Sequence, residues 1–361
     1  MLFHFFTSLI DQYSFFNVFK YLTFRTGLSV MTSLVVVFLI GAPLIKIFSE
    51  KMITGPIRQD GPIDHIVKKS GTPTMGGVII IIGMLTSTFL WADLTNIYVW
   101  TLIFVSLSLG GLGLLDDILK IKFKNSSGLK SRYKFTGQLI IGSITLLILI
   151  KFSDHKYLYD LYFPFFKNLI LNMGLFFIPF GLFVIIGASN AVNLTDGLDG
   201  LATVPVMLVA ISFTLISYVV GNTIFSEYLQ IQYIPNVGEL SIFCGSIVGS
   251  CLGFLWYNAP PAKIFMGDTG SLSLGGSLAA ISIIVKHEIV LAIIGGLFVL
   301  ETVSVIIQVI SFKLTGKRIF KMAPIHHHFE KKGWAESTIV IRFWIIAIIL
   351  ALIGLATLKL R

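Results

Sequence analysis

Ten apolar stretches, most of them close to 20 residues long, constrain the fold of this 361-residue chain more than any other feature. A helix that crosses a bilayer needs about 20 mostly apolar residues, and inside lipid only helices and closed barrels satisfy their backbone hydrogen bonds. Only 12% of the residues are charged, against about 25% in ordinary soluble domains. We therefore predict an all-α polytopic membrane protein with about ten transmembrane helices and a single domain spanning residues 1–361. The expected spans are 26–46, 75–92, 97–115, 135–152, 171–189, 201–221, 238–256, 270–286, 289–312 and 339–358.

The basic residues are distributed unevenly between the connecting loops. Of the 27 lysines and arginines, 18 lie in alternate connectors, at 46–74, 116–134, 190–200, 257–269 and 313–338. Lysine and arginine are enriched in cytoplasmic loops of membrane proteins. The pattern predicts that these five loops face the cytoplasm and that both termini are extracytoplasmic. The excess positive charge is accounted for by topology, and no nucleic-acid partner is expected.

One of these loops is unusually rich in amide and carboxylate side chains. The segment Asn190-Ala-Val-Asn-Leu-Thr-Asp-Gly-Leu-Asp-Gly carries Asn190, Asn193, Asp196 and Asp199 within ten residues. Asn and Asp favour turns and helix N-termini, so helix capping is one interpretation. Capping explains one such residue and not four, which favours a site for a polar, polyvalent ligand.

Two other predicted cytoplasmic loops also bring aspartate to this face. Asp116 and Asp117 are adjacent at the end of the third apolar stretch, and Asp268 stands in Gly267-Asp-Thr-Gly before the eighth. Adjacent carboxylates repel each other, and a divalent cation offsets that repulsion; Mg²⁺ is commonly held by one or two carboxylates plus substrate phosphates. A solvated helix end with nearby lysines, or a helix cap at Asp268, are the simpler alternatives. The convergence of three acidic loops on one face favours the metal site.

The first and last cytoplasmic loops carry candidate ligand-binding groups of other kinds. Lys68, Lys69 and Thr74 lie in a Gly- and Thr-rich segment before a helix, which suits a phosphate group, although lysines there also have a topological role. The last loop contains three consecutive histidines, His326, His327 and His328. Neighbouring residues seldom ligate one zinc ion, so binding of a sugar or phosphate group is favoured. Glu301, after Gly295-Gly296, is an ionisable group within a predicted span.

Taken in order, the motifs resemble those of the polyprenyl-phosphate N-acetylhexosamine-1-phosphate transferases. The resemblance rests on Gly71-Thr-Pro-Thr-Met-Gly-Gly, Leu115-Asp-Asp, the 190–200 segment, Asn258, Phe265-Met-Gly-Asp-Thr-Gly and Pro324-Ile-His-His-His-Phe-Glu. The histidine loop is similar to that of the bacterial branch. The resemblance implies transfer of phospho-N-acetylmuramoyl-pentapeptide from UDP-N-acetylmuramoyl-pentapeptide to undecaprenyl phosphate, with release of UMP. It also implies dependence on Mg²⁺, a homodimer, and a bacterial inner-membrane location with the active site facing the cytoplasm.

The same resemblance assigns roles to individual residues. Asp268 and Asp116 are expected to hold Mg²⁺, and Asp117 is the candidate base or covalent nucleophile; direct attack by the lipid phosphate is favoured over a covalent intermediate. The expected nucleotide and substrate contacts are Lys68, Lys69, Thr74, Asn190, Asn193, Asp196, Gly197, Leu198, Asp199, Asn258, Phe265, His326, His327 and His328. Phe265 is placed against the uracil ring. Gly295-Gly296 and Glu301 are expected to mark a broken helix that borders a groove for the prenyl chain.

Two other functions are compatible with parts of the sequence. A relative that uses UDP-N-acetylglucosamine shares most of the motifs, but the triple-histidine loop argues against it. A transporter or lipid flippase also has many spans and buried ionisable groups. It predicts polar groups along a transmembrane path, whereas here the carboxylates collect at one face.

Overall fold

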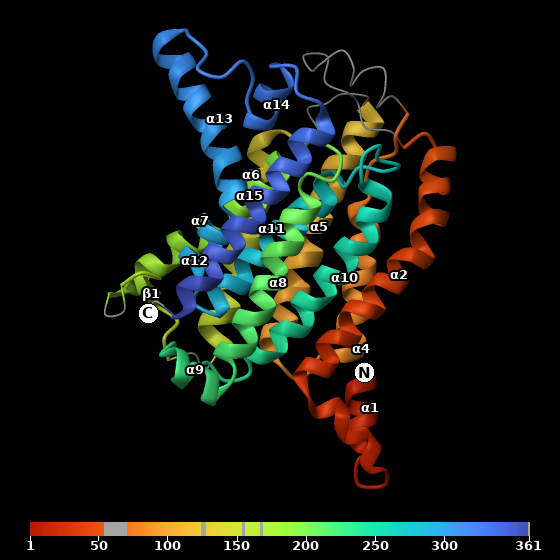
Figure 1. Ribbon diagram of the computed structural model, residues 1–361, viewed down its shortest axis with the longest axis vertical. Coiled ribbons are helices and arrows are strands. Elements are labelled where there is room, and N and C mark those ends of the chain that lie inside the picture. Colours follow the sequence, from red (N-terminus) through yellow and green to blue (C-terminus); the bar gives the residue numbers. More distant parts are fainter. Residues whose placement is uncertain (54–70, 124–127, 154–155, 167–168, 360–361) are drawn as a thin grey trace.

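The computed structural model describes residues 1–53, 71–123, 128–153, 156–166 and 169–359, and it is almost entirely helical (Figure 1). The only sheet among these residues is a two-stranded antiparallel hairpin in which Leu161 pairs with Leu171. The α-helices are α1 Leu2–Ser8, α2 Leu22–Glu50, α4 Gly77–Trp91, α5 Ile97–Phe123, α6 Ser131–Phe152, α7 Phe177–Thr195, α8 Thr203–Val220, α9 Thr223–Leu229, α10 Leu240–Asn258, α11 Gly267–Ile284, α12 Glu288–Ile294, α13 Gly296–Thr315, α14 Ile325–Glu330 and α15 Glu336–Ala356. The strands are β1 Asp160–Tyr162 and β2 Ile170–Asn172, and short 3₁₀ turns cover Ser14–Lys20, Gly174–Phe176, Val237–Glu239 and Thr357–Lys359.

The all-α membrane architecture is confirmed, whereas the prediction of ten spans is matched only in part. Within the described residues, eight helices are long and apolar enough to cross a membrane. The second predicted span corresponds to α4, which has only 15 residues. The eighth corresponds to α11, whose many glycines and serines lower its hydropathy. The ninth is interrupted at Gly295, which separates α12 from α13 as the Gly-Gly pair predicts.

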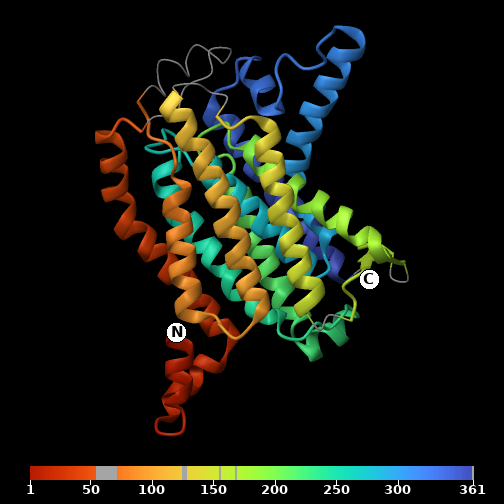
Figure 2. The ribbon, with the colours of Figure 1, turned by 180° about the vertical axis from the view of Figure 1, so that it is seen from behind.

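The two ends of the molecule differ in what they carry. Figure 1 shows α14 at one end of the bundle, with α1 and α9 at the other, and both chain termini lie toward the end that carries α9. From behind, Figure 2 shows α4, α5 and α6, coloured from orange to yellow, running side by side. In both views α13 leans out of the bundle at the end that carries α14. This arrangement agrees with termini on the side opposite the histidine loop; the membrane sidedness itself stays a prediction.

Small residues allow the central helices to approach closely. Along α10, Gly245, Gly249 and Gly253 recur every four residues on the face that packs against α2. A Cβ added at Gly249 would lie 2.0 Å from the carbonyl oxygen of Val30. Association of helices in lipid depends on such close packing, because lipid tails are as apolar as leucine side chains.

Helix α11 is enclosed by its neighbours along its whole length. Every residue from Asp268 to Ile284 is buried, and α11 packs mainly against α5 and α7. A Cβ on Gly77 of α4 would lie 2.0 Å from the backbone nitrogen of Gly270. The first turn of α11 is therefore held in a fixed position between α4 and α5, and this turn carries Asp268.

Candidate active site: an acidic centre at the start of α11

Asp117, near the end of α5, closes the N-terminal turn of α11. Its carboxylate accepts hydrogen bonds from the backbone nitrogens of Asp268, at 3.2 Å, and Thr269, at 3.0 Å, and from the Thr269 hydroxyl at 2.8 Å. Backbone N–H groups at a helix N-terminus have no partner within the helix and carry a partial positive charge, so a carboxylate is stabilised there. The side chain of Asp117 thus holds α5 and α11 together at the site.

Asp116 and Asp268 lie beside Asp117. The three residues offer carboxylate oxygens that all lie within 4.8 Å of one another, and all three residues are buried. The backbone nitrogen of Leu129 donates to Asp116 Oδ1 at 2.7 Å, and the Asn193 amide donates to Asp268 Oδ1 at 2.9 Å. The structure brings the three predicted aspartates together from two helices separated by about 150 residues of chain.

Two lysines compensate part of this negative charge. The ammonium group of Lys120 lies 2.6 Å from Asp116 Oδ2, 3.0 Å from Asp268 Oδ1 and 3.9 Å from Asp117 Oδ1. Lys134, at the start of α6, pairs with Asp268 Oδ2 and lies 3.8 Å from Asp116. Three carboxylates and two ammonium groups leave one net negative charge. Repulsion between buried carboxylates is strong in a medium of low dielectric, and clustered carboxylate oxygens are the ligands that hard divalent cations prefer.

Glycines at the site leave no room for side chains. A Cβ on Gly113 would lie 2.2 Å from the carbonyl oxygen of Asp268, so α5 and α11 touch through their backbones. Gly267 has φ +74° and packs against the Asp117 carboxylate and the Thr74 hydroxyl. A positive φ is readily adopted only by glycine. The Met-Gly-Asp-Thr-Gly motif thus permits the turn that delivers Asp268 to Asp116 and Asp117.

The Gly- and Thr-rich segment of the first loop lies against the residues that precede Asp268. The backbone nitrogen of Phe265 donates to the carbonyl oxygen of Pro73 at 2.9 Å, and that of Gly76 donates to Phe265 O at 2.8 Å. Thr74 therefore lies beside the acidic centre. Phe265, which is half-buried, makes both of these backbone hydrogen bonds and so lies next to Thr74. Lys68 and Lys69, predicted to bind phosphate, lie outside the described residues.

The 190–200 segment reaches the acidic centre through Asn193. Asn193 donates to both Asp268 and the Ser271 hydroxyl, the latter at 2.8 Å. Asn190, one turn earlier on α7, donates to Gln138 Oε1 at 2.9 Å and to Ile186 O at 2.8 Å. Asn193 is thus a direct neighbour of the acidic centre, whereas Asn190 joins α7 to α6.

The end of this segment, residues 196–200, forms a compact turn after α7, which we call the 196–200 turn. Leu198 is buried in a small apolar cluster with Leu201 and Phe343. The Asp199 carboxylate accepts from the backbone nitrogen of Ala262 at 2.9 Å. The backbone nitrogen of Asp199 donates to Glu336 at 2.9 Å, at the start of α15. Asp196 caps the end of α7, and Gly197 follows it. Asp199 therefore has a structural function in addition to any contact with a ligand.

Asn258 is buried and hydrogen-bonded within the protein. Asn258 is 1% exposed; its oxygen accepts from the Thr203 hydroxyl at 2.8 Å and its nitrogen donates to Ile264 O at 2.9 Å. It shapes the 259–263 connector.

His326 is fully buried beside Glu301, His327 lies 2.5 Å from Glu330, and His328 Nδ1 accepts from the backbone nitrogen of Lys321 at 3.0 Å. Each of the three imidazoles therefore has a partner of its own within the protein.

His328 gives a pH-dependent prediction. Desolvation lowers the pKa of His328 from its usual 6.5, and the charges of Lys332 and Lys321 lower it further. The folded loop favours the neutral His328 ring. The contribution of this ring to the stability of the folded protein is therefore complete above pH 6.5 and is lost as the pH falls through the lowered pKa. Histidine NMR titration of the protein in detergent should show His328 titrating below 6.5. His328→Ala should remove that resonance; a titration midpoint at or above 6.5 contradicts the prediction.

Some residues at the site were not predicted. In the sequence Lys134 is one of many loop lysines, and Thr269 is part of a motif that does not indicate Asp117 as its hydrogen-bond partner. No local signal separates Lys134 from the lysines that set topology, because both kinds stand at the predicted cytoplasmic end of a span. Thr269 follows Asp268 directly in the Gly-Asp-Thr-Gly motif, and its position two residues into a helix is a signal for hydrogen bonding at the N-terminus.

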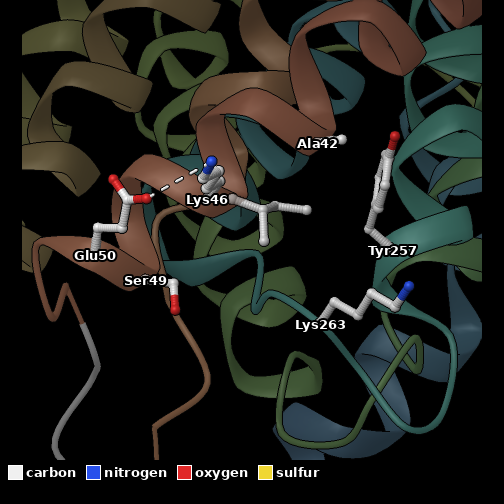
Figure 3. Close-up of a pocket in the computed structure, with 7 residues that line it drawn as sticks. Ala42, Lys46, Ser49, Glu50, Tyr257 and Lys263 are labelled. Atoms are coloured by element: carbon white, nitrogen blue, oxygen red, sulfur yellow. Dashed lines mark ion pairs between the residues drawn. The ribbon is translucent and has the colours of Figure 1, made fainter.

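A second hollow is separate from the acidic centre. Figure 3 shows this pocket, of about 350 Å³, between α2 and α10. It is lined by Ala42, Ile45, Lys46, Ser49, Glu50, Tyr257 and Lys263. Lys46 and Glu50 are exposed and 3.9 Å apart, a separation at which surface ion pairs contribute little to stability. None of the three aspartates lines it, so we place the chemistry at the start of α11.

The fold and the site together define a multi-pass membrane protein with a buried acidic centre, suited to a divalent cation, at one end of its helical bundle. Comparison with known proteins identifies the family. The family model for glycosyl transferase family 4 matches residues 99–286, and the phospho-N-acetylmuramoyl-pentapeptide-transferase signature 1 matches residues 69–81.

Two curated relatives match over their full lengths. A phospho-N-acetylmuramoyl-pentapeptide-transferase of Pelagibacter ubique (strain HTCC1062) is 69% identical over 361 residues, and one of Maricaulis maris (strain MCS10) is 54% identical over 371 residues. In both cases 100% of each chain is covered. This chain therefore belongs to the phospho-N-acetylmuramoyl-pentapeptide-transferase family, which confirms the resemblance noted from its motifs.

Proposed function

We propose that this protein transfers phospho-N-acetylmuramoyl-pentapeptide from its UDP-linked form to undecaprenyl phosphate, giving the undecaprenyl diphosphate-linked sugar peptide and UMP. The observation that carries the proposal is the meeting of Asp116, Asp117 and Asp268 with Lys120 and Lys134, in a chain of this family. Both substrates are anionic at their reacting phosphates. A centre that combines cation-binding carboxylates with ammonium groups is suited to bring two such anions together.

The surroundings of the centre provide for one soluble and one lipid substrate. We assign the nucleotide to the side formed by the 196–200 turn and Phe265, an aromatic residue of the kind that stacks on planar rings such as uracil. We assign the prenyl chain to the side of α13, where only Leu297, Phe298, Glu301 and Ser304 are buried. The remaining side chains of α13 include a long exposed apolar surface, among them Val303, Ile307 and Ile310. An apolar helix that leans away from the bundle suits contact with a lipid tail.

We favour direct attack of the lipid phosphate on the β-phosphorus of the UDP-linked substrate. A bond forms between a lipid phosphate oxygen and the β-phosphorus, and the bond from that phosphorus to the bridging oxygen breaks, so that UMP leaves with the electron pair. The second pKa of a phosphomonoester is about 6, so the lipid phosphate is already mostly dianionic at neutral pH and a general base adds little. Positioning and charge neutralisation then supply most of the rate enhancement.

The contacts of Asp117 support this route. Its two oxygens accept three hydrogen bonds from the first turn of α11. A carboxylate stabilised in this way is a weak nucleophile, because the donors withdraw charge from the oxygens that would attack. We assign Asp117 to positioning α11 and the acidic centre rather than to covalent catalysis.

Asp116 and Asp268 would hold Mg²⁺, with Asn193 orienting Asp268. Bound there, Mg²⁺ would neutralise charge on the diphosphate and on the leaving UMP. The residues fit this ion because their ligands are carboxylate oxygens, which Mg²⁺ prefers, and because one net negative charge remains at the centre after pairing with lysine. Lys120 and Lys134 would then contact substrate phosphates.

Asp117→Asn distinguishes the two chemical routes. If lipid phosphate attacks directly, the variant should keep a measurable fraction of turnover, with a loss of about 10- to 100-fold from the altered contact with Thr269. Loss of a covalent nucleophile costs about 10⁶ in kcat. Single-turnover UMP release is the measurement, and chemical quench should detect no sugar phosphate attached to the wild-type protein. A trapped adduct on Asp117 would refute the direct route.

The proposed reaction is tested with purified protein in detergent. Undecaprenyl phosphate and Mg²⁺ are supplied together with either labelled UDP-N-acetylmuramoyl-pentapeptide or UDP-N-acetylglucosamine, and UMP release is followed. We expect release with the muramoyl pentapeptide substrate only, and its loss when the divalent cation is chelated. No release with that substrate would overturn the proposal, and release with UDP-N-acetylglucosamine would assign the chain to the alternative reaction.

We further propose that the protein is a homodimer in the bacterial plasma membrane with the acidic centre facing the cytoplasm. The charge distribution of the loops supports this sidedness. Native mass spectrometry in detergent reports the dimer mass directly. Labelling of a cysteine introduced at Lys317 from one side of the membrane reports sidedness, because Cys244 and Cys251 are both buried. A monomer mass, or labelling from outside intact cells, contradicts the respective proposal.

A further inference from the structure

Glu301 and His326 form a fully buried pair between α13 and α14. Each side chain is 0% exposed, and His326 Nδ1 lies 3.1 Å from Glu301 Oε1. Among the residues that the structure describes, neither oxygen of the Glu301 carboxylate and neither nitrogen of the His326 ring has a hydrogen-bond partner, so the pair is held by charge and proximity alone. Burying polar and charged groups is unfavourable unless they are paired, so such a pair needs an explanation beyond packing.

Glu301 faces the bundle rather than the lipid. The buried positions of α13 are Leu297, Phe298, Glu301 and Ser304. Their spacing places them on one face of a helix. Glu301 is therefore the ionisable residue on the single stripe by which an otherwise exposed helix contacts the protein, and its contact on that stripe is His326.

His326 in turn packs against the 196–200 turn. A Cβ added at Gly197 would lie 2.3 Å from His326 Nε2 and 2.9 Å from its Cε1. The imidazole therefore occupies the space next to the backbone of Gly197, between Asp196 and Leu198. A change in the orientation of the ring changes the space that this turn occupies.

We propose that Glu301 is a positioning residue that acts through His326 on the nucleotide-binding turn. The Glu301 carboxylate lies 3.1 Å from His326 Nδ1, and its negative charge favours the tautomer and orientation of the ring that keep the Nδ1–H on that side. His326 Nε2 then faces Gly197 and holds the 196–200 turn in the conformation that binds the nucleotide. The inference rests on the proposed function, which assigns this turn to the nucleotide. Glu301, within the membrane, would then influence the cytoplasmic site without touching the substrate.

The test compares Glu301→Ala, Glu301→Gln, His326→Ala and the double variant Glu301→Ala/His326→Ala. Binding of UDP to purified protein in detergent is measured by calorimetry, alongside KM for the UDP-linked substrate. We expect Glu301→Ala to raise the Kd for UDP about tenfold, equivalent to about 1.4 kcal/mol. Glu301→Gln keeps a partly negative oxygen facing Nδ1 and should restore most of the affinity. The double variant should bind UDP no more weakly than His326→Ala alone, since both changes remove one pathway.

Gly197→Ala provides a second measurement of the same contact. In the wild-type background its Cβ clashes with His326 and should weaken UDP binding. Combined with His326→Ala, the clash is relieved and the affinity should recover to that of His326→Ala alone. Independent, additive effects of Gly197→Ala and His326→Ala would contradict the contact on which the inference depends.

Glu288→Ala is the matched control. Glu288 is also buried and pairs with Lys286 at 2.7 Å. It begins α12, at the end of that helix farther along the chain from α13 and Glu301. Its removal should lower the melting temperature and leave the Kd for UDP unchanged. If Glu301→Ala does only the same, or if wild-type protein fails to bind UDP, the inference is wrong. Because UDP binding is measured without turnover, a wild-type protein that binds UDP but releases no UMP refutes the proposed reaction and leaves this inference standing.

Discussion

Asp268→Asn should lower the rate of UMP release about 1,000-fold while leaving the fold intact. The side chain of Asp268 contacts Lys120, Lys134 and Asn193, so it is the carboxylate on which most of the centre converges. Asparagine retains the size but removes one negative charge, which leaves the centre without net charge and weakens the attraction for a divalent cation. The backbone nitrogen of residue 268 still donates to Asp117, so the first turn of α11 remains in place.

The measurement is steady-state UMP release across a range of Mg²⁺ concentrations. A tenfold increase in Mg²⁺ should recover part of the lost rate, because weaker binding is offset by mass action. Asp93→Asn is the control: its carboxylate accepts from the backbone nitrogen of Thr95 at 2.9 Å in the connector between α4 and α5, away from the site. A rate for Asp268→Asn within tenfold of wild type at all Mg²⁺ concentrations would show that this carboxylate is not part of the reacting centre.

Gly113→Ala should reduce activity by about 100-fold and also destabilise the protein. The added Cβ would lie 2.2 Å from Asp268 O and 2.6 Å from Thr269 N, both of which are backbone atoms that cannot rotate away. Helices α5 and α11 must therefore separate, which moves Asp117 from the N-terminal turn of α11. A displacement of about 1 Å at a reacting centre costs about 100-fold in rate, and overpacking typically costs about 1–3 kcal/mol.

Gly111→Ala, on the same helix, is the matched control. A Cβ at Gly111 meets nothing within 4 Å in the described structure, so the substitution should leave activity unchanged. It should also raise stability slightly, because alanine favours the helix over glycine by about 0.8–1.0 kcal/mol. Activity and melting temperature of the two variants, measured side by side, separate close packing at the site from a general effect of alanine in α5. Equal activities of the two variants would contradict the close approach of α5 and α11.

Much of the fold followed from local patterns. Apolar stretches of suitable length predicted helices because a membrane leaves the backbone no other partners than its own. The break at Gly295-Gly296 was also predictable, since glycine weakens a helix interior. Three parts were not: the short length of α4, the complete enclosure of α11 by protein, and the pairing of β1 with β2. α11 departs from the pattern because it is enclosed by protein and has glycines and serines where a lipid-facing helix has leucines.

The candidate site was predictable as a set of residues and not as a geometry. Asp116, Asp117 and Asp268 were expected on one face, and the structure places them within contact. The three histidines were expected to contact the sugar or the diphosphate, which stays a prediction; the structure adds that His326 turns inward to Glu301 while His327 and His328 have partners of their own. Adjacent residues of a helix point in directions about 100° apart, so the different partners of the three rings follow from the tertiary packing and not from the motif.

The sequence by itself determined the class of protein, the predicted side of each loop and the family, because composition, hydrophobic length and ordered motifs are properties of short segments. Only the tertiary structure decided which charged groups meet. Lys134 lies beside Asp268, 134 residues away along the chain, and His326 lies against Gly197. Such contacts depend on how closely helices pack, and that distance is set by glycines such as Gly113 and Gly77 acting together across several helices.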